Sequence, residues 1–159
     1  PIPDPNTGLF NTSIFKSTHS LFIGNGEKLA VPYDQAIVYN HFFSLFDSTF
    51  TCLESGLYGL SFSAILECNG GPGNLKGSVQ GYIKVMPYGT EYHGGFILFE
   101  DNNAGLNFDP YIMSYGVTIY LRKGWTFQII LEKVVNDTSV IITPISAHNI
   151  KTVLSIQRI

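Results

Sequence analysis

The fold is decided by one stretch, Ser48-Thr49-Phe50-Thr51-Cys52-Leu53-Glu54-Ser55-Gly56-Leu57-Tyr58-Gly59-Leu60-Ser61-Phe62-Ser63-Ala64. Its second arm alternates apolar residues with small ones, which places Tyr58, Leu60 and Phe62 on the same side. A period of two is typical of an extended strand with one apolar face. Gly56 lies between the two arms, where a glycine fits a corner with positive φ. The stretch therefore predicts a short strand, a tight corner and a longer strand.

The composition favours one domain with a partly covered surface. The chain has 159 residues, a length that suits a single domain. Only 13% of the residues are charged, about half the usual share. Self-association is the simplest explanation, and an exposed apolar binding patch is the second. The net charge of −3 gives no basic face for nucleic acid. No apolar run approaches the roughly 20 residues that span a bilayer.

The rest of the chain also consists of strand-like segments separated by turns. Val79 to Met86 and Ser114 to Leu121 alternate in the same way, and no segment has helical periodicity. Roughly ten such strands predict an all-β sandwich or barrel. Residues 1–9 are rich in proline and are expected to form the end of a linker or stalk, so the globular domain covers residues 10–159. A start at Pro1 indicates a processed form or an excised domain.

A family resemblance rests on two motifs. Phe50-Thr51-Cys52 followed by Gly56-Leu57-Tyr58 and Ser61-Phe62 closely resembles the central motif of the C1q domain, a jelly roll related to the tumour necrosis factor (TNF) fold. Ile119 to Phe127 resembles a second signature of that family, from which Trp125 departs. The similarity extends over about residues 10–159 and implies a ten-stranded C1q/TNF-like jelly-roll sandwich that assembles as a homotrimer. The resemblance also implies aromatic and aliphatic side chains along the threefold axis, and the candidates are Tyr58, Leu60 and Phe62.

The function implied by this resemblance is recognition without catalysis. A secreted trimeric head would bind an extracellular glycan, a protein or a cell surface. One alternative is the receptor-binding head of a viral or bacterial fibre, located at the virion surface in the viral case. Another is a TNF-like ligand of a cell-surface receptor.

Two features bear on an extracellular location. Cys52 and Cys68 flank the long strand and could be buried thiols or a disulfide, and the family resemblance favours the disulfide. Asn11-Thr12-Ser13 and Asn136-Asp137-Thr138 are N-glycosylation sequons, which predicts glycans on Asn11 and Asn136.

No motif indicates an enzyme. The histidines lack metal-binding spacing, no Gly-x-Ser-x-Gly elbow is present, and the glycine-rich Gly70 to Gly73 turn lacks the Gly-Lys-Ser/Thr order of a phosphate loop. The acidic loop from Glu100 to Asp109 offers the oxygen ligands that calcium prefers. Some C1q domains bind calcium near the trimer apex through two Asp in the corresponding loop. The resemblance thus implies a calcium site at Asp101 and Asp109, and the alternative is a solvated loop.

Overall fold

The computed structural model describes residues 11–18, 23, 26–38, 41–70, 75–101, 111–134, 140–144 and 152–159. This part of the chain is all-β and contains no helix that could cross a membrane. Its strands are β1 (Thr12–Ser17), β2 (Lys28–Ala30), β3 (Gln35–Val38), β4 (Phe43–Phe46), β5 (Thr49–Cys52), β6 (Gly56–Gly70), β7 (Leu75–Met86), β8 (Thr90–Asp101), β9 (Tyr111–Leu121), β10 (Thr126–Val134), β11 (Val140–Pro144) and β12 (Thr152–Arg158).

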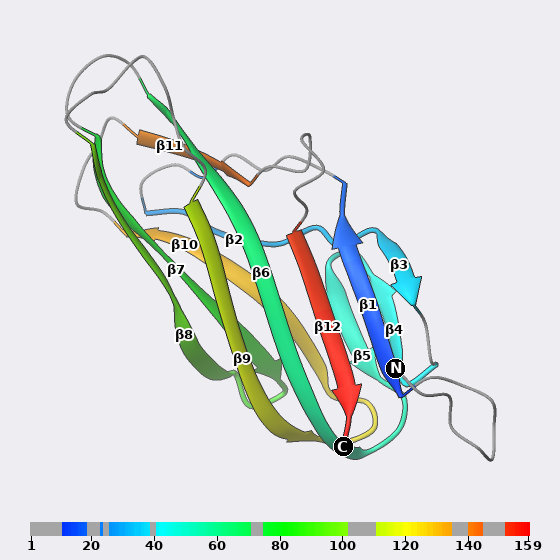
Figure 1. The fold of residues 1–159 in the computed structure, drawn as a ribbon. Helices are drawn as coiled ribbons and strands as arrows, with labels where there is room; N and C mark the ends of the chain where they lie inside the picture. Colours follow the sequence, from blue (N-terminus) through cyan, green and yellow to red (C-terminus); the bar gives the residue numbers. More distant parts are fainter. Residues whose placement is uncertain are drawn as a thin grey trace.

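The strands form two facing antiparallel sheets (Figure 1). The front sheet has the order β9-β6-β12-β1-β3, and β11 continues along β6 beyond the end of β12. The back sheet has the order β4-β5-β10-β7-β8, with β2 beside β10. Two six-stranded sheets packed face to face confirm the all-β sandwich, with twelve strands in the described residues where about ten were expected. The additional strands are short segments before β5, where apolar runs are too brief for periodicity to separate them.

The long strand β6 lies inside the front sheet and pairs with neighbours on both edges. Its inward residues Tyr58, Leu60, Phe62 and Ala64 are buried, which confirms the predicted strand and its apolar side. Along its length it pairs with β9 on one edge and with β12 and then β11 on the other. The expected positive φ at Gly56 is wrong, because this residue begins the strand. The left-handed residues nearby are Asp47 and Ser48, in the β4–β5 turn.

The core between the sheets is aromatic at its lower end. The rings of Phe50 and Phe127 stack with centroids 4.9 Å apart. Phe15 from the front sheet meets Phe50 edge-on at 4.9 Å, and Phe43 from the back sheet meets Tyr58 at 4.8 Å. Such edge-on and stacked pairs add to the gain from burial itself. The stretch that decides the fold therefore supplies the centre of the core from both sheets.

Candidate assembly face

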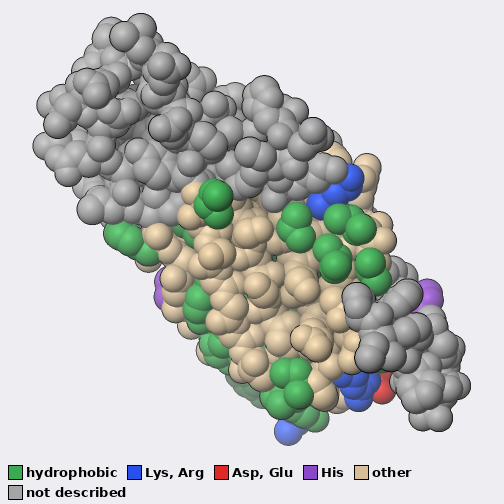
Figure 2. Space-filling view, in the orientation of Figure 1, with side chains coloured by type: hydrophobic (Ala, Val, Ile, Leu, Met, Phe, Trp, Pro, Cys, Tyr) green, Lys and Arg blue, Asp and Glu red, His purple; other side chains and the backbone are tan. Residues whose placement is uncertain are grey.

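Among the described side chains, the outward side of the front sheet is almost free of charge. Side chains on this side alternate with the buried ones along β9, β6 and β12, and β1 adds one charged residue, Lys16. Figure 2 shows the face as small and polar side chains with separate apolar groups, and with blue only towards its margins. We call this set the assembly face: Ile112, Ser114, Gly116, Thr118 and Tyr120 of β9, Leu57, Gly59, Ser61 and Ser63 of β6, and Val153, Ser155, Gln157 and Ile159 at β12.

The centre of the assembly face is hollow. Glycine and small hydroxyl residues of β9, β6 and β12 line a shallow depression of about 340 Å³. Larger exposed apolar side chains stand around it, namely Leu57, Tyr120, Ile112 and Ile159. The small residues thus leave room for the side chains of a neighbouring molecule, and the larger ones offer apolar area to bury.

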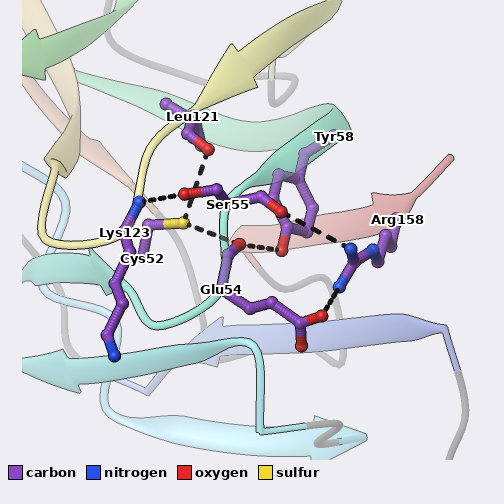
Figure 3. Close-up of polar contacts among 7 residues, drawn as sticks. All are labelled: Cys52, Glu54, Ser55, Tyr58, Leu121, Lys123 and Arg158. Carbon is purple, nitrogen blue, oxygen red and sulfur yellow. Dashed lines mark hydrogen bonds and ion pairs between the residues drawn. The ribbon is translucent and has the colours of Figure 1, made fainter.

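The lower border of this face is fixed by a polar cluster at the end of the sandwich (Figure 3). An Nη1 atom of Arg158 lies 2.6 Å from Oε1 of Glu54, and the guanidinium lies 4.8 Å from the ring centroid of Phe42. The backbone N–H of Lys123 donates to Oγ of Ser55 at 2.7 Å. These contacts tie the last residues of β12 to the β5–β6 and β9–β10 turns.

The same cluster contains two groups with raised pKa values. Burial raises the pKa of Tyr58 to about 12, and its hydroxyl donates to the carbonyl of Glu54. Burial likewise raises the pKa of the Cys52 thiol, which contacts the carbonyl oxygens of Glu54 and Leu121. Both groups are therefore protonated at neutral pH, and the thiol is not activated as a nucleophile.

The expected Cys52–Cys68 disulfide is wrong for this fold. Cys52 is a free, buried thiol beside the start of β6. Cys68 lies near the other end of β6, where its backbone pairs with Ile142 of β11. A strand rises about 3.3 Å per residue, so the two positions are separated by roughly 40 Å along the strand. A disulfide requires Cα atoms within about 7 Å.

The expected trimer core is also wrong. Tyr58, Leu60 and Phe62 are at most 1% exposed within a single chain, because the back sheet covers them. Their ring contacts are made inside the sandwich, for example Phe62 with Tyr115 at 6.2 Å. Side chains that are buried in the monomer cannot line an axis between subunits. The residues available for such an axis are the alternate ones along β6, beginning with Leu57.

The remaining sequence-predicted sites are only partly within the described residues. Asp101 ends β8, and its side chain lies outside the description, as do all of Asp109 and Asn136. The structure places Asn11 at an exposed position, where its carbonyl accepts a hydrogen bond from the backbone of Arg158. Residues 1–9 lie outside the described part. In the residues that are described, no group of three or more His, Cys, Asp or Glu side chains could hold a metal.

The assembly face was missed at the level of the sequence, although a signal was present. The apolar residues that alternate along β6 are those of the core. The residues between them, which point outward, are Leu57, Gly59, Ser61 and Ser63. Among the side chains that the structure describes, this outward half has no charge on three adjacent strands, which is unusual because surfaces of soluble domains are rich in charged residues. That pattern becomes visible only when the strand order is known.

Comparison with known proteins supports the architecture. No protein-family model matches this sequence, and no curated protein matches it either. The crystal structure of murine APRIL at pH 8.0 is similar with a TM-score of 0.61 and 7% identity, over 93% of this chain and 98% of that chain. The structure of Eiger TNF from S. frugiperda is similar with a TM-score of 0.61 and 7% identity, over 95% of this chain and 93% of that chain. These similarities confirm a C1q/TNF-like jelly roll and do not single out C1q domains.

Proposed function

We propose that this chain is the recognition head of a secreted homotrimer, that it binds an extracellular ligand without catalysis, and that the assembly face forms the contact between subunits. The observation that carries the proposal is the lack of charge among the outward side chains of β9, β6 and β12 that the structure describes. Moving an ion out of water costs several kcal/mol. A sheet face without ions can be covered by a second copy of the chain at little electrostatic cost.

Two further observations support the proposal. The fold is that of TNF-type proteins, and the resemblance to C1q domains implies a trimer. The low overall charge of 13% fits a domain whose surface is partly covered. The absent disulfide removes one argument for secretion, which rests on the resemblance and on the exposed position of Asn11, the acceptor residue of a sequon.

Sedimentation equilibrium tests the assembly directly. The protein at micromolar concentration should sediment as a single species of about three times 17.6 kDa. A chain that stays monomeric over this range would contradict the proposal. A stable dimer would retain the assembly face as an interface and would rule out the threefold arrangement.

Calcium binding at Asp101 and Asp109 is a separate part of the proposal. Three copies of an acidic loop near a threefold axis would repel one another unless a cation neutralised them. Bound calcium would then raise the melting temperature as its concentration rises. Melting in chelator and in millimolar calcium should be compared for the native chain and for the Asp101→Asn, Asp109→Asn double variant. A native curve that is identical in both conditions rules out the site.

A further inference from the structure

A second hollow lies on the opposite side of the molecule, on the outward side of the back sheet. It has a volume of about 330 Å³ and is lined by residues of β5, β10 and β7. The register places Thr126 beside Met86 and Gln128 beside Lys84. From β5, Thr49 completes the floor, and its Oγ1 accepts a hydrogen bond from Nε2 of Gln128 at 3.0 Å. We call this depression the back hollow.

Exposed apolar side chains gather around the back hollow. Phe46 is 84% exposed and stands directly opposite Thr49 in the β4–β5 pair. Tyr88 is 80% exposed in the turn that follows Met86, and its ring meets Trp125 edge-on at 5.7 Å. Phe46 and Met86 therefore border a floor of hydroxyl, amide and amine groups, and Tyr88 lies two residues beyond Met86. Exposed apolar side chains that adjoin polar ones around a depression are a feature of ligand-binding grooves.

The chemistry of the floor selects the ligand. Threonine hydroxyls both donate and accept hydrogen bonds, a glutamine amide does both at its two ends, and lysine donates. The positive charge of Lys84 is opposed by Glu91, its cross-strand neighbour in β8. The hollow therefore presents many hydrogen-bonding groups and little net charge. A protein anchor would need an apolar, desolvated pocket instead.

We propose that the back hollow binds an uncharged oligosaccharide. The hydroxyl groups of a hexose can both donate and accept, so they can satisfy the side chains of Thr49, Gln128 and Lys84 together. A sugar ring also has an apolar face made of C–H groups. This face can pack against an exposed aromatic ring such as that of Phe46 or Tyr88. This site lies on the back sheet, away from the assembly face, so it does not depend on the trimer.

A glycan array tests the proposal. The native protein should bind uncharged oligosaccharides terminating in mannose, galactose or N-acetylglucosamine, with little loss on raising the salt concentration. Binding only to sialylated or sulfated glycans, lost at high salt, would overturn the uncharged ligand. Absence of binding to every glycan at millimolar concentration would overturn the site.

Matched variants then locate the binding. The best uncharged oligosaccharide from the array is titrated by calorimetry into the native chain, Phe46→Ala, Tyr88→Ala and Phe96→Ala. Phe96 is an exposed phenylalanine of the same sheet at the edge strand β8 and serves as the control. Affinity should fall about tenfold for Phe46→Ala and for Tyr88→Ala, and should not change for Phe96→Ala. If all three variants lost affinity equally, or if none of them lost affinity, the oligosaccharide would bind outside the back hollow. Sedimentation of the same samples shows separately whether the assembly is intact.

Discussion

The two sheets of this sandwich follow one alternation but present different outer surfaces. On the front sheet, none of the outward side chains of β9, β6 and β12 within the described part is charged. On the back sheet, Lys28 pairs with Glu132 at 3.6 Å, and Nε2 of His93 lies 2.8 Å from Oε1 of Glu91. Both sheets contribute fully buried apolar side chains to the core. The difference therefore arises outside the core.

This contrast indicates which surface remains in water. Cross-strand ion pairs on an exposed sheet keep the surface soluble and contribute little stability, and they would have to be desolvated if a partner covered them. On the back sheet, Lys28 of β2 pairs with Glu132 of β10 and Glu91 contacts His93 within β8, whereas none of the described outward side chains of β9, β6 and β12 is charged. The charge pattern thus favours the front sheet as the contact in the proposed assembly and the back sheet as the surface that stays in water.

The largest expected effect concerns the core that both faces share. Phe62→Ala should lower the free energy of unfolding by about 3–5 kcal/mol, because it leaves a cavity between the sheets. Phe46→Ala removes the same ring from an exposed position and should change it by less than about 0.5 kcal/mol. Urea unfolding of both variants measures the difference. If Phe62→Ala lowered the free energy of unfolding by less than about 1 kcal/mol, Phe62 would not be a core residue and could lie at a subunit interface.

The next test introduces a charge on the assembly face. Thr118 is exposed and pairs with Gly59 at the centre of the face. Thr118→Glu should weaken assembly roughly a hundredfold or more, because a carboxylate from each subunit would be buried. The same substitution at Thr90, an exposed residue of the back sheet, should have no effect on mass. Analytical ultracentrifugation compares the two, and an intact trimer of Thr118→Glu contradicts the assignment of the face.

Alkaline pH tests the polar cluster below the assembly face. Burial raises the pKa of Tyr58 to about 12, above its usual value of about 10. The unfolded chain therefore releases the phenolic proton first, so stability is complete below pH 10 and falls as the pH rises towards 12. The native chain should lose about 2 kcal/mol more than Tyr58→Phe over this range. Parallel losses in the two proteins would mean that Tyr58 is not protected from water.

The smallest effect is expected from the ion pairs of the back sheet. Lys28→Ala removes an exposed partner of Glu132 and should cost at most about 0.5 kcal/mol, and less at high salt. Urea unfolding at low and high salt measures this. A loss of more than about 2 kcal/mol in the free energy of unfolding would show that the Lys28–Glu132 pair is shielded from water.

The sequence was sufficient for the interior and insufficient for the exterior. Alternation along β6 correctly grouped Tyr58, Leu60 and Phe62, because a strand places every second residue on one side. The alternation does not show whether this side packs against a second sheet or against a second chain, because either contact would be apolar. The order of the strands, which decides this, depends on pairings between distant segments such as β1 and β12.

The wrong disulfide has a different cause. The two cysteines flank a segment that was itself predicted to be extended, and an extended segment holds its ends apart. Combining the length of the strand with the short reach of a disulfide would have excluded the bridge. The back hollow could not be predicted, because Thr49, Lys84 and Gln128 come together from three strands.

The position of β12 has a consequence for folding during synthesis on the ribosome. This strand lies between β6 and β1, and in the described residues β1 and β3 reach the rest of the front sheet only through it. A ribosome delivers the chain in order, at about 5–20 residues per second. Until residues 152–159 have emerged, one edge of β6 remains open from Tyr58 to Ser63, and open edges template the pairing of unrelated chains. A translational pause just before this segment would lengthen the time for which this edge of β6 stays open to other chains.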